Sequence, residues 1–346
     1  SIPGSPVSSS AHYRQPTGGR STPTGPFSPS PPAGVRLNWP ENRARAPPPP
    51  LPVTERPHKI GKYTILSEIG QGASAFVYVG EDPFNDRKVA IKVARSYVDM
   101  SEEEANRFEK LFLNEASLAG KLNHPHIVQI YDAVADADPS YIVMEYVAGG
   151  TLEPYCTPDR LLPMIDLVEM IFKCTRALDF AYRLGVIHRD LKPANILRAG
   201  SSGSDVKISD FGAALSASSD QTAVAGIGSP AYMSPQQVKD HPLNHQSDIF
   251  SLGVVFYQLL TGHLPFLGTN NFSLVYQITH GDPIPPTQVR PDLPPCLDAI
   301  VMKALEKDLE KRYPTWDAFS FELAEVFRNE GMAAMRGTLS GASGTA

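Results

Sequence analysis

Hydrophobic and polar positions divide the chain into three parts. Residues 1–57 hold nearly half of the 33 prolines, among many Ser, Gly and Thr. Such a segment cannot bury enough apolar surface to offset the entropy lost on ordering, so we predict that it is disordered. Apolar runs separated by turn residues occupy 58–330. The stretch 331–346 is small and polar and is predicted to be a flexible tail.

The apolar runs predict strands first and helices later. Short β-rich runs at 63–70 and 76–81 flank a glycine turn, which predicts a hairpin. Apolar residues recur at helical spacing from 162 to 184, where Gly185 ends the helix. A short strand at 206–208 follows, and then helices, the last two around 296–307 and 315–328. This order predicts an α+β fold with a small β-rich part and a larger, mostly helical part.

Residues suited to phosphate chemistry follow the first long helix. The loop His188-Arg189-Asp190-Leu191-Lys192-Pro193-Ala194-Asn195 carries a carboxylate, an ammonium and an amide, and Asp210-Phe211-Gly212 follows one strand and one turn later. Phosphoryl transfer from a magnesium nucleotide requires a positioned hydroxyl and neutralised phosphate charge. Asp190 would accept or orient the hydroxyl, and Lys192 would reach the moving phosphate. Asn195 and Asp210 offer the oxygen ligands that Mg²⁺ prefers.

This loop and the triplet match the signature H-R-D-L-x-x-x-N followed by D-F-G. On these residues the sequence resembles the eukaryote-like (Hanks-type) serine/threonine protein kinase family, and the stretch 228–237 looks most like bacterial members. The resemblance implies a bilobal protein-kinase fold, with a β-rich N-lobe at 58–147 that carries one key helix and a mostly helical C-lobe at 148–330. It also implies transfer of the γ-phosphate of ATP to Ser or Thr hydroxyls of proteins, with Mg²⁺ or alternatively Mn²⁺.

Two further segments match sequences that bind nucleotide phosphates: a glycine-rich turn and a strand that contains a lysine. The stretch from Gly70 through Gly72 to Val77 matches G-x-G-x-x-G-x-V, with Ala75 in place of the third glycine, and glycines let the backbone close over phosphates. Lys92 lies on a predicted strand of apolar residues, where a buried ammonium needs a partner. By resemblance, Lys92 contacts the α/β-phosphates and Glu115 holds it. Glu115 lies on a helix predicted to start near Ser101, and the rival acids are Glu104 and Glu109.

The apolar strand from residue 141 to 147 resembles the hinge between the lobes. Met144 would guard the back of the adenine pocket, and the backbones of Glu145 and Val147 would hydrogen-bond the base. The apolar faces of the pocket are predicted from residues that would otherwise be ordinary core side chains: Ile69, Val77, Ala90 and Leu197.

The stretch 213–227 is predicted to be disordered until something orders it. Arg189 beside the predicted base is typical of kinases in which a phosphate clamps this segment. We favour Thr222 as the phosphorylation site; the other hydroxyls are Ser216, Ser218 and Ser219, and the alternative is that none is modified. Ser229, in the segment that resembles the peptide-receiving part of the family, would hydrogen-bond Asp190 and Lys192.

Three positions depart from the family or leave a choice. Gln236 stands where the family has a Glu that pairs with an arginine, here Arg312. Ala119 stands where a large apolar residue usually packs, which suggests that activation needs a partner or homodimer contact and that Ala119→Leu should raise basal activity. Asp248 either braces the catalytic loop or caps its own helix.

Composition changes this picture little. The net charge of −6 does not favour binding to nucleic acid or to an anionic membrane. The three cysteines lack metal-ligand spacing, which indicates reduced thiols in a cytoplasmic protein. No apolar run is long enough to span a bilayer. The proline run at 47–52 could dock a partner or act as a stiff basic linker. A nucleotide-binding pseudokinase scaffold and a small-molecule kinase are the rival functions.

Overall fold

The computed structural model describes residues 57–72, 75–94, 116–117, 119–135, 139–200, 203–211 and 230–341, with 330–341 described as backbone only. The chain divides into two units, residues 1–54 and 55–346, and every described residue belongs to the second. The predicted disorder of the first segment therefore lies outside the described residues, except for Pro57. The predicted helix from Ser101 lies outside them too, except for residues 116, 117 and 119 at its end, which are helical.

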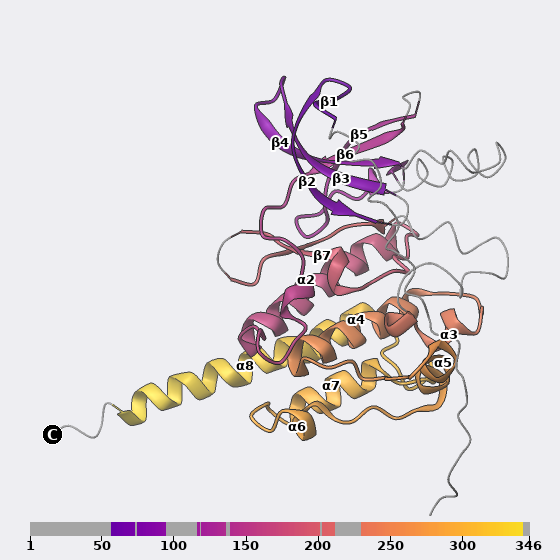
Figure 1. The fold of residues 1–346 in the computed structure, drawn as a ribbon. Helices are drawn as coiled ribbons and strands as arrows, with labels where there is room; N and C mark the ends of the chain where they lie inside the picture. Colours follow the sequence, from indigo (N-terminus) through magenta and orange to yellow (C-terminus); the bar gives the residue numbers. More distant parts are fainter. Residues whose placement is uncertain are drawn as a thin grey trace, which may run out of the picture. The chain divides into compact units, whose positions relative to one another are not determined.

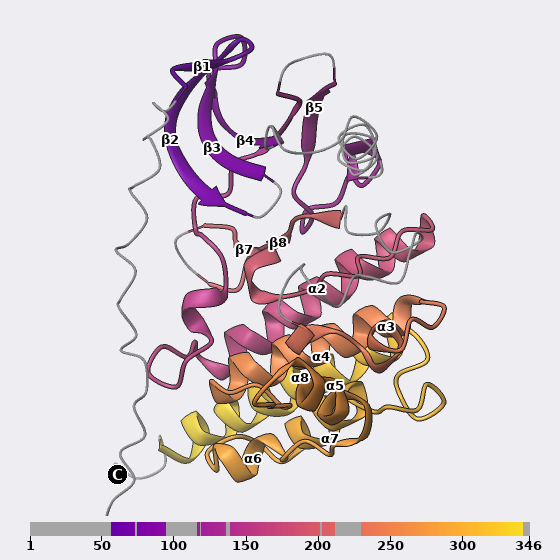
Figure 2. The ribbon, with the colours of Figure 1, turned by 45° about the vertical axis from the view of Figure 1, so that its right-hand side comes forward.

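A six-stranded antiparallel sheet forms the N-lobe (Figures 1 and 2). Its spatial order is β1-β2-β3-β4-β6-β5, which consists of Lys59–Ile60, Tyr63–Gln71, Ala75–Asp82, Arg87–Ala94, Tyr141–Glu145 and Ile130–Val134. The predicted hairpin is confirmed, since β2 pairs with β3 across the glycine turn. Alternate residues of these strands form one buried cluster, which includes Tyr63, Val89, Ile91 and Tyr141.

The C-lobe is mostly helical, as predicted, and the second figure shows its helices gathered below the sheet (Figure 2). Its longer helices are α2 (Met164–Arg183), α4 (His245–Thr261), α5 (Asn271–His280), α7 (Cys296–Ala304) and α8 (Trp316–Gly341). Shorter helices are η1 (Glu153–Tyr155), η2 (Pro193–Asn195), η5 (Pro230–Tyr232), α3 (Pro235–Val238) and α6 (Pro286–Val289). The main core surrounds α4, whose residues are buried almost throughout.

A two-stranded sheet lies in sequence between residues 188–195 and 210–212, the two motifs predicted for phosphate chemistry. It pairs β7 (Ile196–Arg198) with β8 (Val206–Ile208), and β8 is the strand predicted at 206–208. Gly185 follows α2 in a left-handed conformation at φ 77°, as expected of a helix-ending glycine. Residues 186–192 follow the end of α2 and lead into η2 and then β7.

The expected end of the last helix at residue 328 is wrong. The helix α8 continues to Gly341 and so includes most of the stretch 331–346 that was predicted to be a tail. The small and polar residues of this stretch suggested a tail, but an isolated glycine costs a helix only about 1 kcal/mol relative to Ala. The Met, Ala and Arg residues between Gly331 and Gly337 favour the helix. None of the helices in the described part of the chain is both long and apolar enough to cross a membrane.

Candidate active site

The loop of residues 188–195, referred to as the catalytic loop, is held by a buried carboxylate. Asp248 on α4 accepts hydrogen bonds from the backbone N–H groups of His188 and Arg189, at 2.7 and 2.8 Å. Asn244, and not Asp248, caps α4, because its side chain accepts from the amide of Gln246. The prediction that Asp248 braces the loop is therefore confirmed over the alternative of a helix cap.

His188 joins the catalytic loop to the strand that delivers Asp210. Its ring is fully buried. The ring Nδ1 accepts from the amide of Asp190 at 3.2 Å, and Nε2 lies 2.9 Å from the carbonyl oxygen of Ser209. Since Nδ1 is an acceptor, a neutral ring carries its proton on Nε2 and donates it to Ser209. The aromatic ring of Phe211 lies 4.7 Å from the His188 ring, centroid to centroid, which extends the same connection.

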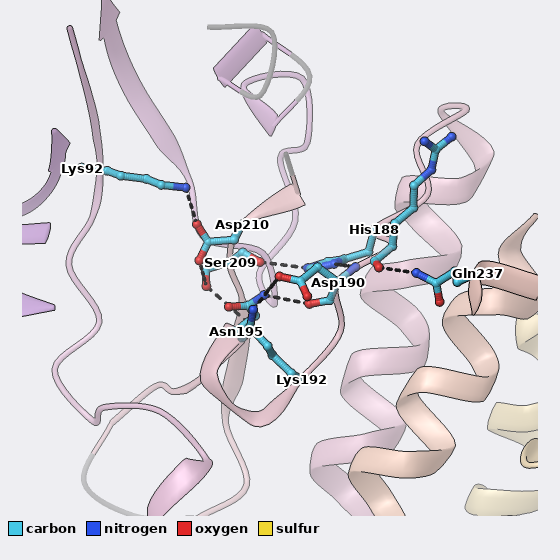
Figure 3. Close-up of polar contacts among 9 residues, drawn as sticks. Lys92, His188, Asp190, Lys192, Asn195, Ser209, Asp210 and Gln237 are labelled. Atoms are coloured by element: carbon cyan, nitrogen blue, oxygen red, sulfur yellow. Dashed lines mark hydrogen bonds and ion pairs between the residues drawn. The ribbon is translucent and has the colours of Figure 1, made fainter. Parts of the chain in front are cut away.

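Asp190, Lys192 and Asn195 form one polar cluster (Figure 3). The ammonium of Lys192 lies 2.7 Å from Oδ2 of Asp190. The amide nitrogen of Asn195 donates to the same Oδ2 at 3.1 Å and to the Asp190 carbonyl at 2.7 Å. Because the amide nitrogen is engaged in this way, the oxygen of Asn195 is the atom that it can offer to a metal.

Lys92 and Asp210 meet across the two lobes (Figure 3). Their Nζ and Oδ1 atoms are 2.7 Å apart, and Oδ2 of Asp210 accepts from the Ser209 hydroxyl at 3.0 Å. Burial alone would raise the pKa of Asp210, but the positive charge of Lys92 and the hydrogen bonds from Lys92 and Ser209 outweigh it and lower the pKa. Asp210 is therefore a carboxylate at neutral pH.

Strand register brings several predicted nucleotide-binding residues onto one face of the N-lobe sheet. Val77 lies opposite both Gly70 and Lys92, and Ala90 lies opposite Met144. Directly opposed residues share a face, and so do residues two apart on one strand, such as Ala90 and Lys92. One face of the sheet is therefore lined by five of the predicted residues: Gly70, Val77, Ala90, Lys92 and Met144.

The remaining pocket residues lie at the edges of this surface. Ile69 is 52% exposed at the end of β2. Gly72 accompanies it in the glycine turn, where its amide donates to the carbonyl of Ala75 at 2.8 Å. Leu197 on β7 forms a bridge with Thr151, just beyond the segment that contains Val147.

The hinge residue Glu145 has contacts that the sequence did not predict. Its carboxylate lies 2.9 Å from the ammonium of Lys207, and its amide donates to the carbonyl of Gln129 at 2.8 Å. Since this N–H is engaged, a contact from Glu145 to adenine must come from its carbonyl. Behind the hinge, Met144 lines a cavity of about 20 Å³ together with Ala119, Asp210 and Phe211.

The two clusters bring together oxygen atoms that can bind a metal ion and ammonium groups that can bind phosphate. The carboxylate of Asp210 and the amide of Asn195 are hard ligands of the kind Mg²⁺ prefers. Lys92 and Lys192 supply the positive charge for phosphate oxygens. The residues therefore fit ATP with a divalent cation.

Several predicted residues lie outside the described residues. These are Glu115, the peptide-segment residue Ser229 and the candidate phosphorylation sites Ser216, Ser218, Ser219 and Thr222. Their assigned roles stay predictions.

The pairing of Gln236 with Arg312 is present. Both terminal nitrogens of Arg312 donate to Oε1 of Gln236 at 3.3 Å, and Arg312 is only 1% exposed. The next residue, Gln237, was missed by sequence reasoning. Its amide nitrogen donates to the carbonyl of Arg189 at 2.6 Å (Figure 3), and the pattern Ser234-x-x-Gln237 of a helix capping box was the only signal in the sequence.

Comparison with known proteins agrees with this geometry. The family model described as the protein kinase domain matches residues 63–322. The serine/threonine-protein kinase PknB of Mycobacterium leprae is 40% identical over 282 residues, which cover 79% of this chain and 44% of that protein. A probable serine/threonine-protein kinase of Streptomyces coelicolor is 36% identical over 279 residues, 78% of this chain and 40% of that protein. A probable serine/threonine-protein kinase of Clostridium acetobutylicum is 34% identical over 270 residues, with the same two coverages. The chain thus spans less than half the length of these relatives.

Proposed function

The chain belongs to the protein kinase domain family, and on this premise we propose that it transfers the γ-phosphate of ATP to Ser or Thr hydroxyls of proteins. The observation that carries the proposal is the pair of clusters in Figure 3, Lys92 with Asp210 and Asp190 with Lys192 and Asn195. The relatives bear the name serine/threonine-protein kinase, which favours Ser and Thr over Tyr.

In this mechanism Asp190 positions the substrate hydroxyl and receives its proton. The hydrogen bonds of its Oδ2 to Lys192 and Asn195 fix the carboxylate and leave Oδ1 for the hydroxyl. Lys192 can turn from Asp190 to the transferred phosphate, since a lysine ammonium is a rotatable point charge. A bound divalent cation would neutralise phosphate charge, and Asn195 and Asp210 would be its protein ligands.

By resemblance to the family, Lys92 would contact the α/β-phosphates of the nucleotide and pair with Glu115. Its ammonium already lies 2.7 Å from Oδ1 of Asp210, next to the residues that would hold the divalent cation. ATP use also accords with a cytoplasmic location of this part of the protein. We further propose that the chain phosphorylates its own segment 213–227, with Thr222 as the first candidate.

A transfer assay tests the proposal. The purified chain with radiolabelled ATP and Mg²⁺ should label a generic basic protein, and Asp190→Asn should lower the rate by about 10²–10⁴-fold, as expected for loss of a general base. Nucleotide binding without any transfer would instead support a pseudokinase scaffold. Label found only on small molecules would support a small-molecule kinase.

A further inference from the structure

We propose that Gln237 is a positioning residue that fixes the peptide unit between Arg189 and Asp190, and through it the orientation of the Asp190 carboxylate. The inference deepens the proposed function, because Asp190 is its predicted base. It rests on contacts among the described residues of α3, α4 and the catalytic loop.

The peptide unit in question is held at both of its polar ends. Its N–H, which belongs to Asp190, donates to Nδ1 of His188 at 3.2 Å. Its carbonyl, which belongs to Arg189, accepts from Nε2 of Gln237 at 2.6 Å. The preceding N–H, that of Arg189 itself, is held by Asp248 at 2.8 Å. Among the described contacts, the hydrogen bond from Gln237 holds the carbonyl end of this peptide unit. Gln237 lies on α3, whereas His188 lies in the loop itself and Asp248 lies on α4.

This part of the loop needs to be held. Arg189 has φ 67°, in the left-handed region that a side chain disfavours. Such a conformation persists only when its surroundings determine it. Without the bond from Gln237, the peptide could rotate toward an ordinary conformation, and the Asp190 side chain would turn with it.

Only a primary amide can make the contacts that Gln237 makes. Its Oε1 accepts from the backbone N–H of Ser234 at 2.9 Å, as in a capping box, while its Nε2 donates to Arg189. Reversing the amide would bring two donors together at Ser234 and two acceptors together at Arg189, so the orientation is fixed. A glutamate would serve the capping box equally well. A glutamate cannot donate to a carbonyl.

This difference supplies a matched test. Gln237→Glu keeps an oxygen that can accept from the Ser234 amide, as in a capping box, and replaces the donor to the Arg189 carbonyl by an acceptor. Ser234→Ala removes the hydroxyl that caps α3 and keeps the bond from Gln237 to Arg189. Three properties should be measured for both variants and for the chain without substitutions. These are hydrogen–deuterium exchange of the catalytic-loop and α3 amides, the melting temperature, and kcat with the KM for ATP.

In Gln237→Glu, the amides of Arg189 and Asp190 should exchange about fivefold faster or more, as expected for loss of one hydrogen bond. Exchange in α3 should stay as it is, and the melting temperature should fall by no more than about 2–4 °C, as expected for loss of a single hydrogen bond. The kcat should fall about tenfold, with the KM for ATP within about twofold, because the nucleotide pocket is untouched. Ser234→Ala should lower the melting temperature by about 2–4 °C without this loss of kcat.

Unchanged exchange in the catalytic loop of Gln237→Glu would overturn the inference. So would a general rise in exchange across α3 and α4 with a fall in the melting temperature well beyond about 4 °C, because Gln237 would then serve packing alone. The exchange result does not depend on turnover. If the unchanged chain transfers no phosphate, the proposed function fails, and the exchange comparison still decides the role of Gln237.

Discussion

The pair Gln236–Arg312 leads to a prediction about stability. Arg312 is almost fully buried, yet its hydrogen-bond acceptors are carbonyl oxygens: those of Glu306, Gln246 and Lys307 in the backbone and Oε1 of Gln236. Burial lowers the pKa of Arg312 to about 10. Burial, and then the nearby charge of Arg312, lower the pKa of Lys307 to about 7. The site thus contains a buried cation opposite a neutral amide.

Gln236→Glu should therefore stabilise the protein. A carboxylate about 4 Å from the guanidinium carbon gains about 4 kcal/mol at an effective dielectric constant near 20. Desolvation of the new carboxylate cancels much of this gain. A further small loss comes from the weak bond that the Gln236 amide donates to the Lys307 carbonyl at 3.3 Å. We expect a net gain of about 1–2 kcal/mol, which raises the melting temperature by about 2–6 °C.

Calorimetry of Gln236→Glu, alone and in a Lys307→Met background, would check this prediction. If the carboxylate acts on Arg312, the gain should be similar in both backgrounds. If it acts on Lys307, the gain should disappear in the second. Phosphate transfer should persist in either case, because Gln236 contacts neither Asp190 nor Asp210 in the described contacts. A melting temperature that is unchanged or lower in both backgrounds would refute the reasoning.

Two further predictions concern Lys307 and Ala119. Lys307 lies 3.5 Å from the centre of the Phe266 ring, and its pKa of about 7 is well below the ordinary 10.5. Between pH 7 and pH 10.5, Lys307 is protonated in the unfolded chain and mostly neutral in the folded protein. The free energy of unfolding should therefore rise with pH from about 7 to 10.5. This slope should be smaller in Lys307→Met, as urea titrations at several pH values would show; equal slopes would exclude Lys307. Ala119 lines the cavity of about 20 Å³ beside Phe211, which has no room for the three added carbons of Ala119→Leu. Ala119→Val should fill it, raise the melting temperature by about 2 °C and raise basal activity, whereas a lower melting temperature would indicate overpacking.

Local pattern and motif spacing predicted much of the fold, and the motifs supplied the residues of the candidate site. Alternation of apolar residues located the hairpin, and the motif residues located Lys92, Asp190, Asn195 and Asp210. The pairing of Lys92 with Asp210, 118 residues apart, could not follow from the pattern, because it depends on how the two lobes meet. The end of α8 was missed because the small and polar composition after residue 330 suggested a tail, although the Met, Ala and Arg residues there favour a helix.

Side-chain contacts hold the backbone in place at two positions of the site; that of Asp248 was predicted from sequence, whereas those of Gln237 with Arg189 and Lys92 with Asp210 were missed. Arg189 and Asp210 both have positive φ, 67° and 59°, a conformation that an arginine side chain disfavours and that Asp adopts more readily than most residues. Each conformation is stabilised by side chains distant in sequence: Asp248 and Gln237 hold the first, and Lys92 holds the second. A helix cap or a core position can be predicted from its neighbours, whereas these contacts exist only once α3, α4 and the N-lobe sheet are assembled. Substitutions among them should therefore impair phosphate transfer more than they lower stability.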